Sequence, residues 1–187
     1  MPAILALDIS GVPRKWISQD DAITYHAKGD VAWSLGEVVA KYHGGIQKSG
    51  ELSYIESPSI IAIRGHGFDP HKHAHVPLTN KTLFGRDRYM CAVCGTVHDD
   101  YRKLSRDHII PVSKGGQNTY ENCITMCKPC NSYKGNKTLK EAELELLYIP
   151  YRPNHWENLI LQNRNVLADQ MDFLASGLPK HSRILLN

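Results

Sequence analysis

The sequence lacks an uninterrupted apolar run near the roughly 18 residues that a membrane-spanning helix needs. It also lacks a charged and then apolar leader at its beginning, which is the pattern that directs export. We therefore expect no membrane partner and a cytoplasmic location. A chain of 187 residues is long enough to bury a core, either as one domain or as a small core with extensions at both ends.

Cysteine is scarce, and its arrangement is informative. The 5 cysteines form two CxxC pairs, Cys91 with Cys94 and Cys127 with Cys130, and leave Cys123 over. An odd count in this pattern argues against a disulfide framework and favours metal binding in a reducing compartment. Adjacent thiolates on a tight turn can fill two corners of a tetrahedron, which predicts zinc. A redox CxxC or chance core cysteines are the alternatives, and Cys123 itself is expected to be a small buried residue.

The net charge is also small, at +3, but it is unevenly distributed. Residues 81–140 contain 11 Lys and Arg against 5 Asp and Glu, which gives this segment +6 and leaves −3 for the remainder. A basic segment of this kind can mark the footprint of a phosphate backbone, although solvated surface charge would explain many of its residues. The candidate phosphate contacts are Arg86, Arg88, Arg106, Lys114, Lys134 and Lys137.

Residues 1–78 are interpreted as a small mixed α/β extension without a catalytic signature. Ala3–Leu7 predicts a short strand, and Ile60–Ile63 predicts a buried one. Ser18, with an acidic residue three positions later, predicts the start of a helix that ends at Gly29. The glycine pair at 44–45 is expected to interrupt regular structure.

Four histidines lie together near the end of this extension, between residues 65 and 77. Clustered histidines can bind metals. However, glycines and prolines in the segment indicate irregular backbone, and no acidic or cysteine ligand completes a motif. A polar surface linker is the simpler interpretation, and we assign no role to His66, His71, His73 and His75.

Residues 79–140 predict two strands followed by a short helix, with the cysteine pairs at the outer edges. Leu104–Val112 forms the first predicted strand, interrupted at Pro111, and Asn122–Met126 forms the second, with a turn-rich loop between them. Pro129 suits the first turn of a helix, and Gly135 suits its end.

Residues 141–187 are expected to form a helical extension. Thr138 and Glu141 make a capping-box pattern that predicts a helix through Leu147. Apolar residues between 154 and 173 recur at roughly helical spacing, which predicts a further helix packed on the core or on a second copy of the chain.

Residue types that can hydrolyse a phosphodiester lie within and beside the cysteine frame. Asp107 offers a carboxylate and Asn131 an amide oxygen, which are ligands that Mg²⁺ or Mn²⁺ prefers. His108 offers an imidazole that can be neutral near physiological pH and take a proton from water. Because Asp107 and His108 are neighbours on a predicted strand, their side chains should diverge. Asn122 could orient the His108 region by hydrogen bonding to the ring or to loop backbone.

Four short segments surround these residues: Asp107-His108-Ile-Ile-Pro111, Lys114-Gly-Gly116, Glu121-Asn122, and Cys127-Lys-Pro-Cys130-Asn131-Ser-Tyr-Lys134-Gly135. Together they resemble the HNH endonuclease family in its four-cysteine, zinc-bearing form. The specific match covers about residues 79–140. The flanking parts are similar, with much less specificity, to extensions on small bacterial and phage members, which suggests a bacterial or phage origin.

The resemblance implies an α+β protein whose core is a ββα-metal unit, with the N-terminal α/β extension and the C-terminal helical tail on either side. It implies that His108 is the general base, that Asn122 orients this base, and that Asp107 and Asn131 hold the catalytic Mg²⁺ or Mn²⁺. Where the family name has a final histidine this chain has Asn131, a common alternative that favours a hard ion. The residues that would bind a structural Zn²⁺ are Cys91, Cys94, Cys127 and Cys130.

The leading hypothesis is therefore a divalent-metal-dependent endonuclease that cleaves DNA, by nicking or by double-strand cleavage, with a homodimer left open. The alternative is a non-catalytic zinc module that binds nucleic acid or a partner protein, which the basic segment supports. A thiol oxidoreductase is a third hypothesis, and it would require exposed cysteines with low pKa values.

Overall fold

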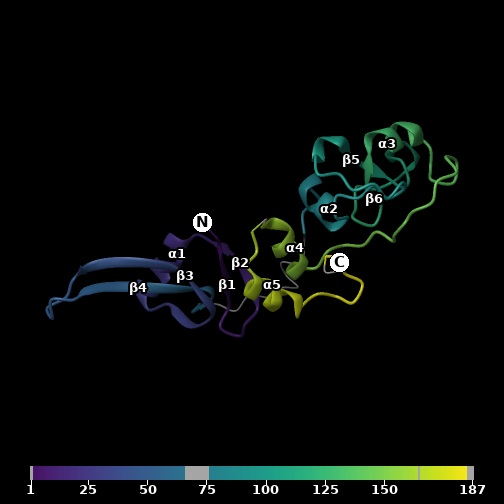
Figure 1. Cartoon of the computed structure of the whole chain (residues 1–187). Helices are drawn as coiled ribbons and strands as arrows, with labels where there is room; N and C mark the ends of the chain where they lie inside the picture. Colours follow the sequence, from purple (N-terminus) through teal and green to yellow (C-terminus); the bar gives the residue numbers. More distant parts are fainter. Residues whose placement is uncertain (1, 66–75, 164, 185–187) are drawn as a thin grey trace. The chain divides into compact units, whose positions relative to one another are not determined.

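The chain folds into two units, each built on its own sheet (Figure 1). The computed structural model describes residues 2–65, 76–163 and 165–184. The first unit comprises Met1–Ala74 and Gln162–Leu178, and the second comprises His75–Leu161 and Pro179–Asn187. The C-terminal segment, predicted as an extension of its own from residue 141, is thus shared between the two units.

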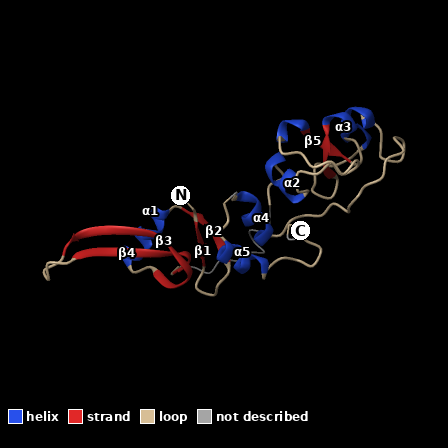
Figure 2. Cartoon of the chain, in the orientation of Figure 1, coloured by secondary structure: helices blue, strands red, loops and turns tan. Residues whose placement is uncertain are grey.

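A four-stranded sheet with the order β2-β1-β4-β3 forms the first unit. β1 runs parallel to β4, whereas the β1–β2 and β3–β4 pairs are antiparallel. The β3–β4 pair continues beyond β1 as a long two-stranded ribbon (Figure 2). The elements are β1 (Ile4–Leu7), β2 (Pro13–Ile17), α1 (Gln19–Lys28), β3 (Val31–Ile46), β4 (Leu52–Ile63) and α5 (Ala168–Ala175).

Helix α1 begins and ends where the sequence predicts. The Ser18 hydroxyl accepts a hydrogen bond from the Asp21 amide at 3.0 Å, and Gly29 ends the helix with φ +73°. Ala22, fully buried on this helix, packs against the sheet. The resulting cluster contains Ile4, Ala6, Ile17, Ala22, Ala40, Ile61 and Ile63.

The predicted interruption at residues 44–45 is wrong, because β3 continues through both glycines to Ile46. The strand absorbs them with a shift in register between His43 and Ile46. A Cβ at Gly44 would lie 2.4 Å from Ser53 Oγ on β4, so a larger residue here would make the Ser53 side chain rotate. Here glycine permits strand pairing and does not end it.

The second unit contains an antiparallel β5–β6 hairpin followed directly by a helix, which confirms the predicted ββα core. Its register pairs Leu104 with Cys127 at one end and His108 with Cys123 at the other. Two short 3₁₀ turns, at Tyr101–Lys103 and Val112–Lys114, flank β5. The elements are α2 (Asn80–Arg86), β5 (Leu104–His108), β6 (Cys123–Cys127), α3 (Lys128–Lys134) and α4 (His155–Gln162).

The predicted helix over 138–147 is wrong, although its capping box forms. The Thr138 amide donates to Glu141 Oε2 at 2.7 Å, and the Glu141 amide donates to Thr138 Oγ1 at 3.3 Å. Glu143 then takes φ +55°, a left-handed conformation that a helix does not continue through. The Leu144 amide donates to Leu139 O at 2.9 Å, which closes the segment as a turn.

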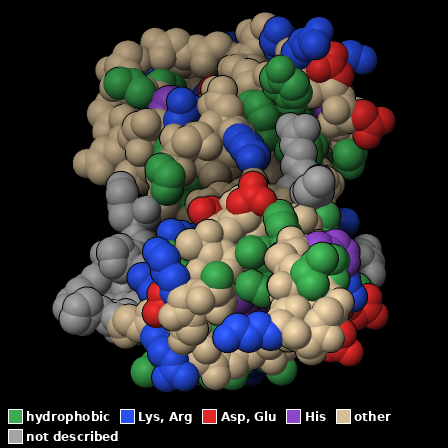
Figure 3. Space-filling model, turned by 90° about the vertical axis from the view of Figure 1, so that its left-hand side faces the viewer, with side chains coloured by type: hydrophobic (Ala, Val, Ile, Leu, Met, Phe, Trp, Pro, Cys, Tyr) green, Lys and Arg blue, Asp and Glu red, His purple; other side chains and the backbone are tan. Residues whose placement is uncertain are grey.

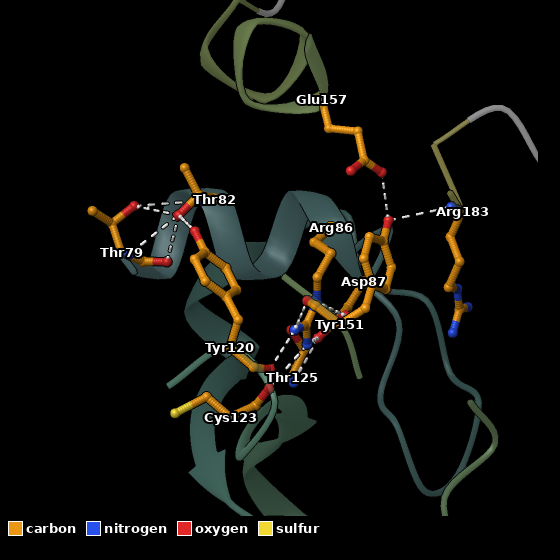
Figure 4. Close-up of polar contacts among 10 residues, drawn as sticks. All are labelled: Thr79, Thr82, Arg86, Asp87, Tyr120, Cys123, Thr125, Tyr151, Glu157 and Arg183. Atoms are coloured by element: carbon orange, nitrogen blue, oxygen red, sulfur yellow. Dashed lines mark hydrogen bonds and ion pairs between the residues drawn. The ribbon is translucent and has the colours of Figure 1, made fainter. Parts of the chain in front are cut away.

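A fully buried ion pair joins α2 to the hairpin (Figure 4). Arg86 Nε donates to Asp87 Oδ1 at 2.7 Å, and Asp87 Oδ2 accepts from the Thr125 amide of β6 at 2.9 Å. Arg86 Nη2 also donates to Asp87 Oδ2 at 3.0 Å. The other three guanidinium hydrogens are donated to backbone carbonyl oxygens, at 2.7 Å to Tyr120 O, 2.9 Å to Cys123 O and 2.9 Å to Tyr151 O. Arg86 therefore holds together segments that are distant in sequence.

This network overturns the prediction that Arg86 contacts phosphate. Its side chain is 0% exposed, and its three nitrogens all donate within the second unit. A buried guanidinium that is satisfied in this way has a structural role.

Replacing Arg86 with Met should lower the free energy of unfolding by about 3 to 5 kcal/mol, because Asp87 would be left as a buried charge without its partner. The measurement is urea unfolding followed by fluorescence or circular dichroism. The control is Arg102→Met, whose side chain is 79% exposed, with an expected change within about 0.5 kcal/mol. Equal stabilities of the two variants would contradict this assignment.

Candidate active site and metal cluster

Four cysteine sulfurs converge at one end of the β5–β6 hairpin. Cys91 and Cys94 lie on a turn that Gly95 completes with φ +75°. Cys127 is the last residue of β6, and Cys130 lies in the first turn of α3. Their four Sγ atoms lie within 4.8 Å of one another. The cluster thus joins a loop, a strand and a helix.

The spacing of the sulfurs fits a tetrahedral metal site. Zinc–sulfur bonds of about 2.3 Å imply sulfur–sulfur distances of about 3.8 Å, and Cys94 Sγ lies 3.9 Å from Cys127 Sγ. A hydrogen bond with the Thr96 side chain lowers the pKa of Cys94 to about 6. Burial and the neighbouring thiols raise the pKa of Cys130. Four thiols this close are stabilised when a cation replaces their protons.

One face of β5 meets α3 and carries the predicted oxygen ligands. Asn131 Nδ2 donates to Ser105 Oγ at 2.8 Å, and Lys134 Nζ lies 2.8 Å from Asp107 Oδ2. Ser105 and Asp107 are two residues apart on the strand and so share a face. Asn131 and Lys134 are one helical turn apart and share the facing side of α3. The structure therefore brings Asp107 and Asn131 to the same strand–helix interface.

The prediction that Lys134 contacts phosphate is wrong. Its side chain is 1% exposed, and besides the ion pair with Asp107 its ammonium donates to the His108 carbonyl oxygen at 2.8 Å. The contact with Asp107 Oδ2 is an ion pair without hydrogen-bond geometry. Lys134 thus contacts the backbone of the predicted base, His108, and the carboxylate of the predicted metal ligand, Asp107.

The opposite face of β5 carries His108. Its Nε2 lies 3.3 Å from Asn118 Oδ1, and the same oxygen lies 3.5 Å from Arg106 Nη1. Because a guanidinium can only donate hydrogen bonds, the amide oxygen of Asn118 must face these groups. The hydrogen of the neutral imidazole then lies on Nε2, which leaves the lone pair on Nδ1.

Sequence reasoning missed Asn118, and it assigned the orienting role to Asn122. The structure places Asn122 on loop backbone: its Oδ1 accepts from the Ile110 amide at 2.9 Å, and its Nδ2 donates to Ile110 O at 3.1 Å and Gln117 O at 2.8 Å. Of the two contacts considered for Asn122, the structure shows the one to the loop. The signal for Asn118 was its place in the turn-rich loop beside β5.

The other residues predicted to contact phosphate differ in their exposure and in their ion pairing. Arg88 and Lys137 are exposed. Lys114 is also exposed but forms an ion pair with Glu141, which lowers the pKa of that carboxyl to about 2. On the face shown in Figure 3, Lys and Arg side chains lie among acidic and hydrophobic ones. The four-histidine loop falls outside the residues that the structure describes.

The hairpin, the helix that follows it and the cysteine cluster together define a ββα-metal domain. Residues 91–147 match the family model described as HNH endonuclease, so this part of the chain is similar to that family.

A curated relative is the type IV methyl-directed restriction enzyme EcoKMcrA of Escherichia coli (strain K12). It is 29% identical over 79 residues, which cover 39% of this chain and 28% of the relative. The chain therefore spans less than a third of that protein. Among the described residues of the present chain, no helix has the length and apolar character needed to cross a membrane.

Replacing Cys127 with Ala should abolish metal binding at the cluster and lower the melting temperature of the chain, because three sulfurs cannot close the tetrahedron. The measurement is metal content per chain by elemental analysis, together with thermal unfolding. Cys123→Ala is the matched control, since Cys123 is buried on the same strand outside the cluster. Equal metal content in both variants would refute the cluster as a metal site.

Replacing Lys134 with Met should lower the free energy of unfolding by about 3 to 5 kcal/mol near neutral pH, because the Asp107 carboxylate would lose its cation at an 11% exposed position. Denaturant titration measures this loss. Lys128→Met, at an exposed position on the same helix, should change stability by about 0.5 kcal/mol or less. A loss no larger than that of the control would show that the ion pair contributes little.

Proposed function

We propose that this chain is a divalent-metal-dependent endonuclease that hydrolyses phosphodiester bonds in DNA. The four-cysteine cluster holds a structural Zn²⁺, and Asp107 and Asn131 hold a catalytic Mg²⁺ or Mn²⁺. His108 is the general base. The observation that carries the proposal is the arrangement of two adjacent residues on β5. Asp107 directs its carboxylate toward α3, and His108 places its imidazole on the other face of the strand.

The donor set fits a hard cation. Asn131 donates one amide hydrogen to Ser105 Oγ, which leaves its carbonyl oxygen as the ligand atom. Asp107 Oδ2 is buried and makes an ion pair without a hydrogen bond, so this side of the carboxylate already accommodates positive charge. Carboxylate and amide oxygens are the ligands that Mg²⁺ prefers. When bound, such an ion neutralises charge on the phosphate and on the leaving oxygen.

His108 takes the proton of the attacking water at Nδ1, because Asn118 fixes the hydrogen on Nε2. The water oxygen forms a bond to phosphorus, the bond from phosphorus to the leaving oxygen breaks, and that oxygen gains a proton from solvent. Lys134 holds the His108 carbonyl oxygen and the Asp107 carboxylate, which fixes the base relative to the ligand. Asn122 ties down the loop that follows the base.

DNA is the proposed substrate on two grounds. The matched relative is by its description a restriction enzyme. The segment 81–140 carries +6, and Arg88 and Lys137 remain exposed within it. Exposed cations attract a phosphate backbone by releasing its counterions.

Replacing His108 with Ala should reduce the rate of plasmid cleavage in Mg²⁺ or Mn²⁺ by about 10² to 10⁴, the usual contribution of a general base. Zinc content and melting temperature should stay close to those of the wild type. The measurement is conversion of supercoiled plasmid to nicked and linear forms under single-turnover conditions.

His43→Ala is the control, because this exposed histidine belongs to the first unit, whereas β5 belongs to the second. It should cleave at the wild-type rate. Full activity of the His108 variant would exclude His108 as the base. A wild-type chain that binds DNA in a salt-dependent way but does not cleave it with any metal ion would indicate a non-catalytic zinc module instead.

A further inference from the structure

Arg106 lies beside His108 on the same face of β5. The two residues are two positions apart in the strand, so their side chains point the same way with Cα atoms about 6.6 Å apart. Both approach Asn118 Oδ1, Arg106 through Nη1 at 3.5 Å and His108 through Nε2 at 3.3 Å. The strand therefore presents a cation and an imidazole side by side.

The contacts that Arg106 makes with the described residues are long. Nη1 donates to Leu78 O at 3.4 Å and to Asn118 Oδ1 at 3.5 Å, and neither acceptor is a carboxylate. Lys134, by contrast, lies 2.8 Å from a carboxylate oxygen, and Arg86 is fully buried in an ion pair at 2.7 Å. Arg106 is half-buried. It thus keeps hydrogen-bonding capacity next to the base, whereas Arg86 and Lys134 are buried and paired with carboxylates.

We propose that Arg106 is a second catalytic residue, which contacts the non-bridging oxygens of the scissile phosphate while His108 activates the water. The proposal rests on the proposed function of the same site. Asn118 positions both groups, because one amide oxygen accepts from each of them.

A cation at this place adds to the charge stabilisation that the metal would supply. Attack of water on phosphorus increases the negative charge on the non-bridging oxygens, and a guanidinium aimed at them stabilises the transition state more than the ground state. Asp107 points from the opposite face of the strand toward Lys134 of α3, so this pair supplies no cation on the His108 side. Arg106 supplies one, and no bond to the guanidinium forms or breaks.

A contact to the DNA backbone away from the reaction would look different in kinetics. Such a contact raises affinity for DNA equally in the ground state and the transition state, so its loss would raise KM and leave kcat unchanged. A purely structural role would alter zinc content or melting temperature. A catalytic role predicts a fall in the single-turnover rate at saturating protein, with affinity for duplex DNA and stability nearly retained.

The test compares Arg106→Gln and Arg106→Lys in the full chain, with supercoiled plasmid and Mg²⁺ or Mn²⁺. Duplex binding is measured by fluorescence anisotropy on zinc-loaded protein without these ions and without chelator. We expect Arg106→Gln to cleave about 10²-fold more slowly at saturation. Arg106→Lys should be intermediate, because it keeps the charge but loses the planar, bidentate geometry. Arg102→Gln, at a 79% exposed side chain, should match the wild type.

Wild-type and His108→Ala proteins in the same assay separate the two proposals. Cleavage by the wild type, loss in His108→Ala and full rate in Arg106→Gln would overturn the role of Arg106 alone. A defect that disappears at saturating protein would also overturn it, in favour of an ordinary backbone contact. A wild-type chain that cleaves nothing would overturn both.

Discussion

The register between β5 and β6 is the constraint on which the candidate site depends. Leu104 pairs with Cys127, and four residues later His108 pairs with Cys123. Because side chains alternate between the faces of a strand, a slip of one residue would turn Asp107 away from α3 and His108 toward it. The separation of metal ligand and base is therefore a property of strand pairing. It needs no unusual backbone at either residue.

Three groups of contacts hold this register. At one end, Cys127 is both the last residue of β6 and a member of the cysteine cluster, so a bound metal would fix that end of the strand. In the middle, the Thr125 amide donates to the buried carboxylate of Asp87. At the other end, Asn122 bonds to the backbone of the loop after β5. The structural parts of this domain thus act through the same strand pair that presents the chemistry.

The sequence predicted the parts of the fold that depend on local spacing or backbone chemistry. The cysteine spacing predicted the cluster, and Ser18 with Gly29 predicted both ends of α1. It could not reveal burial, so Arg86 and Lys134 were assigned to phosphate although both neutralise buried carboxylates. Nor could it reveal Asn118, whose contact with the imidazole depends on how a 14-residue connection between β5 and β6 folds back.

Mn²⁺ binding to the zinc-loaded chain is the measurement that tests the central claim most directly, namely that β5 and α3 together build a second cation site. Calorimetric titration should show one Mn²⁺ per chain in addition to zinc. That binding should be lost in Asp107→Ala and retained in Asp99→Ala, which removes an exposed carboxylate of the same unit. Mn²⁺ binding that is unchanged in Asp107→Ala would contradict the account.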